Sequence, residues 1–331
     1  MKSQVQIKRN WTKAEVEQIY HTPILQLILN AADIHRSLHD PQEVQVCTLL
    51  SVKTGGCPED CAYCPQASRY HTDVKAHRLL SNETILDRAK EAKECGSTRF
   101  CMGAAWREVK DGREFDRILD VVKEVAEMGM EVCCTLGMLN ADQAEKLKNA
   151  GLHAYNHNLD TGEKFYDKII GTRTYQERLA TLANVRNAKI SVCSGGIIGM
   201  GETDEDRIDM LLTLATLPEH PESVPVNALV AVEGTPLEDQ KRVPIWDMIR
   251  MIATARILMP KAMVRLSAGR VRMSQEEQAL CFLAGANSIF AGDKLLTTPN
   301  PEQDTDKQLF SLLGLKPRPA NKTVGHIHET V

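Results

Sequence analysis

The sequence predicts an α/β protein of the TIM-type (β/α)8 barrel class with an N-terminal helical extension. Three observations favour this class: a length of 331 residues, an alternation of apolar or β-branched runs with amphipathic stretches from residue 44 onward, and eight repeats of that alternation. Eight strand–helix units favour a closed parallel barrel over an open doubly wound sheet, which has fewer strands. Losing one strand would leave an open or partial barrel.

The elements follow in order along the chain. Residues 12–38 have the periodicity of one or two amphipathic helices that offer apolar side chains for packing: Ile19, Leu25, Leu27, Ile28 and Ile34. Eight strands are expected at 44–52, 98–102, 131–136, 153–159, 189–198, 223–230, 263–268 and 287–291. Each precedes a helix, near 82–95, 115–128, 141–150, 174–188, 204–217, 245–259, 274–284 and 304–313. Ser, Thr or Asp opens several of these helices and Gly closes them.

This organisation gives a helical extension (1–42), a barrel (43–314) and a polar C-terminal tail (315–331) that is expected to fray. Hydrophobic residues make up 43% and charged residues 25% of the chain, as in an ordinary soluble protein. The net charge of -4 predicts no nucleic-acid partner, and we find no signal peptide or membrane-spanning run. We therefore expect a cytoplasmic protein whose clustered cysteines serve in metal binding or catalysis.

The sharpest local motif is GGCPEDCAYCPQ, which places Cys57, Cys61 and Cys64 in one short loop after the first strand. Zinc sites typically use two separated pairs of ligands, and ferredoxin runs repeat C-x-x-C, so neither spacing matches well. Three thiolates on a 4Fe-4S cluster leave one iron open for a bidentate ligand such as the amino and carboxylate groups of S-adenosylmethionine. A zinc loop or reactive thiols remain the alternatives.

With Tyr63 as the aromatic residue, this C-x-x-x-C-x-aromatic-C motif resembles the signature of the radical S-adenosylmethionine (SAM) superfamily. The resemblance implies that the cluster cleaves SAM reductively to methionine and a 5'-deoxyadenosyl radical, which abstracts hydrogen from a substrate. The motif is specific for a superfamily and not for a substrate.

Four other polar or soft residues lie in apolar strands: Cys101, Cys133, Cys193 and Arg265. Side chains inside a barrel gather in layers from different strands, so these residues can meet along its axis. A buried arginine requires anionic company, and thiolates on a second cluster would supply it. The alternative is that the cysteines are inert core residues and that Arg265 pairs with a carboxylate at the barrel rim.

The chain resembles the biotin synthase family over nearly the whole barrel, through GGCPEDCAYCPQ, STRFCMGAAWR, YNHNLDT, TRTYQERL, VCSGGIIGMGE, VPVNALV, GTPL, VRLSAGR and GANSIFAGDKLLTTPNP. This resemblance implies that Cys101, Cys133, Cys193 and Arg265 hold a 2Fe-2S cluster, the favoured sulfur donor in that family. Adjacent strand residues face opposite sides, so Cys133 faces the axis by family register while Cys134 packs outward. Cys47, Cys95 and Cys281 are interpreted as ordinary apolar residues.

Contacts to SAM and substrate are expected at the ends of the strands. Asn158 and Asp160 are candidate cofactor contacts in YNHNLDT, with an Asx-rich strand-to-helix turn as the alternative. The resemblance places the segment of Gly199 and Glu202 against the cofactor. Arg178 is a candidate partner of the SAM carboxylate, with a solvated surface charge as the alternative.

The resemblance implies the substrate dethiobiotin, which would contact Asn158 and Asn227, and a product, biotin, formed by inserting sulfur between two unactivated carbons. It also implies a homodimer and an external reductant such as flavodoxin or ferredoxin. Rival interpretations are another radical enzyme of the hydrogenase-maturation or methylornithine type, an electron-transfer protein and a zinc-binding module.

Overall fold

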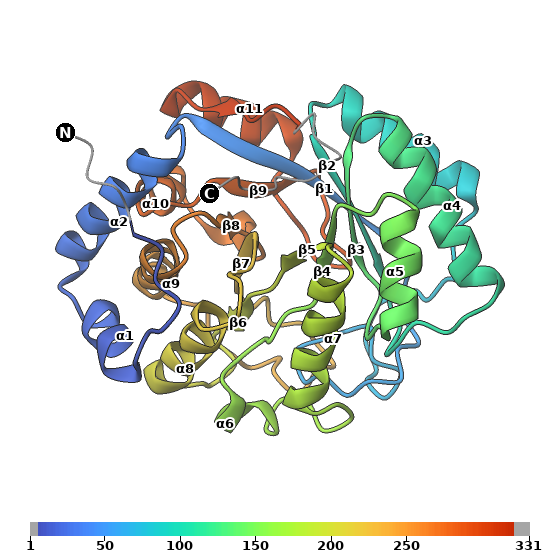
Figure 1. The fold of residues 1–331 in the computed structure, drawn as a ribbon, viewed down its shortest axis with the longest axis horizontal. Coiled ribbons are helices and arrows are strands. Elements are labelled where there is room, and N and C mark those ends of the chain that lie inside the picture. Colours follow the sequence, from blue (N-terminus) through green and yellow to red (C-terminus); the bar gives the residue numbers. More distant parts are fainter. Residues whose placement is uncertain (1–5, 321–331) are drawn as a thin grey trace.

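The computed structural model describes residues 6–320 and contains a closed barrel of parallel strands surrounded by helices (Figure 1). Strand β1 pairs with both β2 and β9, which closes the ring in the order β1-β2-β3-β4-β5-β7-β8-β9. The strands are β1 (Glu43–Lys53), β2 (Arg99–Ala104), β3 (Glu131–Thr135), β4 (Ala154–Asn156), β5 (Ser191–Cys193), β6 (Gly196–Ile198), β7 (Ser223–Ala228), β8 (Met263–Leu266) and β9 (Ser288–Ala291). The predicted eight-stranded barrel is confirmed.

The helices follow their strands as the alternating pattern predicted. They are α3 (Asn82–Glu94), α4 (Arg113–Glu127), α5 (Ala141–Asn149), α7 (Tyr175–Asn187), α8 (Asp204–Ala215), α9 (Ile245–Leu258), α10 (Gln275–Leu283) and α11 (Gln303–Leu313), with a further short helix, α6 (Glu163–Tyr166). Their apolar faces pack on the outer face of the strands and form one large core. Hydroxyl and amide caps begin α3, α5, α7, α8 and α10.

The expected fifth strand, 189–198, is broken into β5 and β6. A side chain at Gly195 would place its Cβ 2.0 Å from the Pro225 carbonyl oxygen, so the backbone approaches β7 more closely than any other residue allows. The Gly195 carbonyl also accepts from the amides of Leu159 and Asp160. At the break, regular strand pairing is therefore replaced by hydrogen bonds to the segment that follows β4.

The N-terminal extension consists of α1 (Lys13–Tyr20) and α2 (Ile24–Leu38), which lie beside α8 and α9 (Figure 1). Leu27 and Ile28 are buried as expected, whereas Leu25 is 70% exposed, because it lies on the solvent side of α2. Tyr20 donates a hydrogen bond of 3.0 Å to Asp204 at the start of α8. The extension is thus fastened by both apolar and polar contacts.

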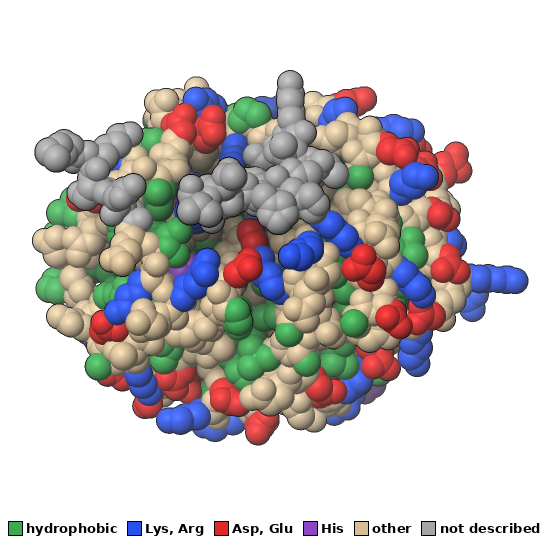
Figure 2. Space-filling view, in the orientation of Figure 1, with side chains coloured by type: hydrophobic (Ala, Val, Ile, Leu, Met, Phe, Trp, Pro, Cys, Tyr) green, Lys and Arg blue, Asp and Glu red, His purple; other side chains and the backbone are tan. Residues whose placement is uncertain are grey.

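The beginning of the tail differs from the expected frayed segment. Strand β10 (Lys316–Pro317) pairs in parallel with Glu43 and Val44 of β1, and Arg318 donates its amide to the Val44 carbonyl. Residues 321–331 of the predicted tail lie outside the described residues. On the face drawn in Figure 2, basic and acidic side chains are interspersed. Within residues 6–320, we find no helix of the length and apolarity needed to cross a membrane.

Candidate active site

A cavity of about 320 Å³ opens at the carboxyl ends of the barrel strands. Its wall contains Cys57, Cys61 and Cys64 from the loop after β1, together with Cys101 and Cys133 from the interior of the barrel. Tyr63, Asn158, Asp160, Arg178, Asn227 and Arg265 complete the set of predicted site residues that line it. The fold therefore brings residues that are up to 208 positions apart, from Cys57 to Arg265, to one cavity.

The cysteine loop, residues 55–66, turns sharply at its start. Gly55 and Gly56 have φ values of 73° and 66°, a region that favours glycine, as the sequence indicated. The loop is closed by backbone hydrogen bonds of 3.0 Å from Cys57 to Gln66 and 2.9 Å from Cys64 to Cys61. Burial raises the pKa of Cys61 to about 12 and that of Cys64 to about 11, so metal binding must displace their protons.

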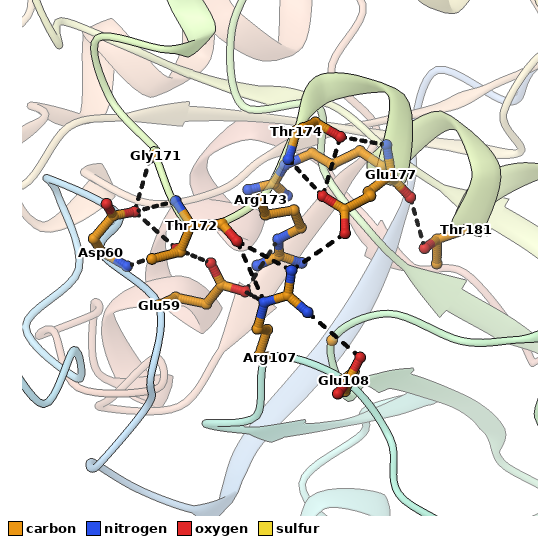
Figure 3. A network of polar contacts seen from close by, with 12 residues as sticks. Glu59, Asp60, Arg107, Glu108, Gly171, Thr172, Arg173, Thr174, Glu177 and Thr181 are labelled. Atoms are coloured by element: carbon orange, nitrogen blue, oxygen red, sulfur yellow. Dashed lines mark hydrogen bonds and ion pairs between the residues drawn. The ribbon is translucent and has the colours of Figure 1, made fainter.

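Two acidic residues within this loop attach it to the segment between α6 and α7 (Figure 3). Asp60 Oδ1 accepts from the amides of Gly171 and Thr172 at 2.9 and 3.0 Å. Glu59, which is buried, lies 3.3 Å from Arg107 Nε and 3.5 Å from Arg173 Nε through its Oε1. These four residues were not predicted from the sequence, because their partners lie far away along the chain.

Tyr63, Asp160 and Arg178 form a chain of charge-assisted contacts on the cavity wall. Tyr63 donates to Asp160 Oδ2 at 2.7 Å, and Arg178 Nη2 lies 2.6 Å from the same oxygen. Burial raises the pKa of Tyr63, and the Asp160 carboxylate raises it further, so the phenol keeps the proton that it donates. Arg178 is buried and not the solvated surface charge of the alternative interpretation.

The two predicted asparagines line the cavity but already have backbone partners. Asn158 Oδ1 accepts from the Gly195 amide at 3.2 Å. Asn227 donates to the Gly196 carbonyl at 2.9 Å and accepts from the Ala268 amide at 3.2 Å. Each amide group is held in a fixed orientation, and each retains at least one N–H for a ligand.

Gly199 and Glu202 are not brought to the cavity wall. The Glu202 carboxylate accepts from the amides of Gly199 and Met200 at 2.8 and 2.7 Å, and it pairs with Arg207 at 2.8 Å. A Cβ at Gly199 would lie 2.4 Å from Val243 Cγ2. These contacts shape the loop itself, so a direct role toward SAM stays a prediction.

Within the barrel, strand register brings together the three cysteines that we call the barrel thiols: Cys101, Cys133 and Cys193. Cys101 on β2 is the register partner of Cys133 on β3, and Cys193 on β5 pairs with Asn156 on β4. All three are buried, and Cys101 packs with Cys133 in one small cluster. Cys134 belongs to the outer core with the helices, on the opposite face of β3.

Arg265 lies in the barrel interior and not at its rim. Its guanidinium donates to Ser288 Oγ at 3.0 Å and to Gln45 Oε1 at 3.4 Å, with Cys193 Sγ 3.7 Å away. The ring of Phe290 faces the guanidinium at 4.7 Å. These contacts place a buried positive charge beside the barrel thiols.

Cys47 is not an ordinary apolar residue, which corrects the sequence interpretation. It faces the barrel interior, where its Sγ lies 3.4 Å from Arg265 Nη2. Burial acts to raise its pKa, but an interaction with Cys101 and the charges of Arg265 and Arg99 outweigh burial and lower it. The polar environment of Cys47 could not be predicted from the sequence, because the residue lies in an apolar strand and belongs to no spacing motif.

A second missed arginine, Arg99, also lies beside the thiols. Its Nη2 forms an ion pair of 2.8 Å with Glu131, while its buried Nη1 has no hydrogen-bond partner. An orphaned buried donor indicates room for an acceptor, and the sulfides of an iron-sulfur cluster are suitable acceptors. The donor set therefore fits a cluster inside the barrel.

The loop offers three thiols to a 4Fe-4S cluster, one fewer than its four irons. Within residues 6–320, no three His, Cys, Asp or Glu side chains gather closely enough to hold one metal ion. In a 4Fe-4S cluster each thiolate binds a different iron, so its ligands lie farther apart than those of zinc.

Comparison with known proteins first gives the class. The sequence model of the Radical SAM superfamily matches residues 51–214, and that of the Biotin and Thiamin Synthesis associated domain matches residues 225–316. The fold is similar to methylornithine synthase (TM-score 0.77, 19% identity, 94% of each chain) and to the FeFe-hydrogenase maturase from Carboxydothermus hydrogenoformans (TM-score 0.76, 16% identity, 93% and 76% of the two chains). At these identities the likeness shows the fold alone.

Closer relatives then give the family. The chain is 72% identical to a biotin synthase of Cytophaga hutchinsonii, over 96% of this chain and 94% of the relative. It is 64% identical to the mitochondrial biotin synthase of Arabidopsis thaliana, over 94% of this chain and 83% of the relative. The chain belongs to the biotin synthase family.

Proposed function

We propose that this enzyme inserts sulfur into dethiobiotin to form biotin, with SAM as the radical source. The observation that carries the proposal is one cavity lined by the cysteine loop and by two of the barrel thiols, Cys101 and Cys133. Radical generation and sulfur delivery can then occur on the same bound substrate. Family membership supports the overall reaction, and the cavity supports the way in which it is divided among residues.

When bound, the 4Fe-4S cluster supplies the electron that cleaves SAM to methionine and a 5'-deoxyadenosyl radical, and the 2Fe-2S cluster supplies the sulfur. We assign the first to Cys57, Cys61 and Cys64, because three thiolates leave a coordination position for SAM. The second is assigned to the barrel thiols, with Arg265 as the remaining ligand or neighbour.

The chain's own residues position the reactants and exclude water. Tyr63 and Arg178 hold Asp160 in place, and Asp160 and Asn158 are oriented to contact the ribose and amino-acid parts of SAM. Arg178 acts through Asp160 in this arrangement and is therefore a positioning residue. The apolar part of the wall keeps the radical dry, through Leu49, Ile197, Leu229, Leu295 and Leu296.

Dethiobiotin fits between these groups. Its ureido ring offers a carbonyl acceptor, which matches the remaining amide hydrogens of Asn158 and Asn227, and two N–H donors, one of which matches the second lone pair of Asn227 Oδ1. Both asparagines are fixed by backbone contacts, so they need little reorganisation on binding. This orientation would place the hydrocarbon part of dethiobiotin toward the barrel thiols.

We further infer that a homodimer receives electrons from flavodoxin or ferredoxin in the cytoplasm. The ten free cysteines of the chain require a reducing compartment, which supports this location. The relative from Arabidopsis thaliana is named as mitochondrial, so the compartment can differ within the family. Size-exclusion chromatography with light scattering and electron transfer from purified flavodoxin test the two partner assignments.

The test is an anaerobic assay of the reconstituted enzyme with SAM, a reductant and dethiobiotin, in which biotin and 5'-deoxyadenosine are measured together by mass spectrometry. Cys61→Ala should abolish both products, because it removes a ligand of the radical-generating cluster. Cys133→Ala should abolish biotin and retain deoxyadenosine. Deoxyadenosine without biotin in the wild type would indicate another radical enzyme, and neither product would indicate an electron-transfer protein.

A further inference from the structure

Cys47 lies among the groups that surround the barrel thiols, although the family resemblance gives it no role. Its register partners on the two neighbouring strands are Arg99 on β2 and Phe290 on β9. Cys47 packs with Cys101, Cys133 and Phe290 in a small cluster that is separate from the main hydrophobic core. The residue therefore points toward the barrel axis, as the barrel thiols do.

The contacts of Cys47 complete a ring of four thiols and one guanidinium. Cys47 packs with Cys101 and Cys133, and Cys193 lies on the far side of the Arg265 guanidinium. Arg265 closes the ring, with Nη2 3.4 Å from Cys47 Sγ and Nη1 3.7 Å from Cys193 Sγ. Cys47 and Arg265 therefore lie side by side in the barrel interior, on the two strands that flank β9.

A second observation points to a ligand in this volume. Arg99 is only 4% exposed and its Nη1 has no hydrogen-bond partner, while its charge acts on Cys47, Cys101 and Cys133. A buried guanidinium nitrogen without an acceptor is costly unless an anionic group occupies the space beside it. An iron-sulfur cluster among four thiols is such a group.

Ligand chemistry favours a thiolate over a guanidinium. A 2Fe-2S cluster is ordinarily held by four cysteine thiolates, whereas arginine has no free lone pair until it loses a proton that it retains strongly. We propose that Cys47 is a reserve ligand of the barrel cluster: its thiolate binds the iron that faces Arg265 whenever the guanidinium does not. The thiol proton passes to solvent on binding, without a change in oxidation state. This inference rests on the proposed function, because it requires the barrel cluster.

The test compares four reconstituted full-length proteins: wild type, Arg265→Met, the double variant Arg265→Met/Cys47→Ser, and Cys134→Ala. Iron and acid-labile sulfide are measured per chain, and Mössbauer spectra count the 2Fe-2S clusters and report whether their two irons are equivalent. Circular dichroism checks that each variant is folded. Cys134→Ala is the matched control, because it removes a buried thiol from the opposite face of β3.

Arg265→Met is expected to retain the 2Fe-2S cluster, now with two equivalent, all-sulfur irons, and the double variant to lose it by at least about tenfold. Equal loss in Arg265→Met and the double variant would overturn the inference while leaving the proposed function intact. Inequivalent irons in Arg265→Met would also overturn the inference. This second outcome can be measured even if the double variant does not fold. A wild type that assembles no 2Fe-2S cluster would overturn both.

Discussion

Arg178 and Asp160 show how much of this site depends on single buried charges. Asp160 is 2% exposed, accepts a hydrogen bond from Tyr63 and forms an ion pair with Arg178. Its negative charge is therefore compensated only while these two partners are present. Asp160 also has a φ of 69°, which is unusual for a residue other than glycine. The surrounding contacts hold this backbone in a conformation that aims the carboxylate at the cysteine loop.

Arg178→Ala is expected to destabilise the protein by about 3 kcal/mol, because it leaves Asp160 buried without its cationic partner. Arg88→Ala removes an exposed pair with Glu91 and should cost less than about 1 kcal/mol. Urea denaturation of both variants gives the comparison. Equal small losses would mean that the pair is as well solvated as a surface pair.

At the same scale, the sequence could reveal Cys57, Cys61 and Cys64 because their spacing is itself a motif. It could not reveal Cys47, whose environment depends on strands that are distant along the chain. The position of Arg265 along the barrel axis could not be predicted either, since spacing alone allowed both the interior and the rim. Family resemblance selected the interior, where the structure places it.

At the scale of elements, the cysteine loop is held by carboxylates in addition to the packing of Cys61 and Ala62 in the core. Glu59 forms ion pairs with Arg107 and Arg173 (Figure 3). Asp60 accepts hydrogen bonds from the amides of Gly171 and Thr172. The loop therefore keeps its shape through contacts with the segment that precedes α7. This segment also carries Arg178 one turn later, which links loop geometry to the cavity wall.

Glu59→Gln keeps the shape of the side chain but removes the charge that pairs with the two arginines. We expect reconstitution to yield less 4Fe-4S cluster per chain, by a few-fold, because the loop no longer holds its thiols in place. Glu108→Gln alters an exposed carboxylate of the same network and serves as the control. Iron analysis that finds equal cluster content in the two variants would argue against this role of Glu59.

The docking of α2 depends on one face of the helix. Leu27→Ala should destabilise the protein by about 2–5 kcal/mol, since it opens a cavity in a fully buried position. Leu25→Ala, two residues earlier and 70% exposed, should change stability by less than about 0.5 kcal/mol. Thermal or urea unfolding of the two variants distinguishes a docked helix from one that only lies nearby.

The interface between α2 and α9 also predicts a loss of stability in acid. Burial, followed by the charge of Arg256, lowers the pKa of His35 from 6.5 to about 3. In the unfolded chain His35 therefore binds a proton below pH 6.5, whereas in the folded chain it binds that proton only below about pH 3. His35 contributes stability that is present above pH 6.5 and is lost as the pH falls through this range, by up to about 1.4 kcal/mol per unit.

His35→Gln should therefore reduce the slope of unfolding free energy against pH between 6.5 and 5. His21→Gln, at an exposed position in the same extension, should retain the wild-type slope. Urea titrations at several pH values give both slopes. An unchanged slope in His35→Gln would show that other groups control acid stability.

Element positions were accessible from the sequence because hydrophobic periodicity and capping residues agree along most of the chain. All eight strands and their helices were located in this way. The break between β5 and β6 was not predictable, since it arises from the approach of Gly195 to Pro225. The pairing of β10 with β1 was missed because two residues carry no periodic signal.

At the scale of the whole molecule, barrel closure places two sets of thiols on one cavity. The loop thiols lie at the carboxyl ends of the strands and the barrel thiols lie deeper among the strands. The loop thiols line the same cavity as Cys101 and Cys133. Chain length and the eight strand–helix repeats predicted the barrel. They could not predict that residues of its interior and of its rim line the same cavity. A substrate held there can meet a radical and a sulfur source without leaving the site.

The most direct test of this arrangement uses enzyme whose 2Fe-2S cluster has been reconstituted with heavy-isotope sulfide. A single anaerobic turnover with SAM and dethiobiotin is followed by mass spectrometry of the biotin formed. The account predicts biotin that carries the heavy sulfur, together with loss of the 2Fe-2S absorption. Biotin with sulfur of natural isotopic abundance would contradict it, because the sulfur would then come from a source outside the barrel.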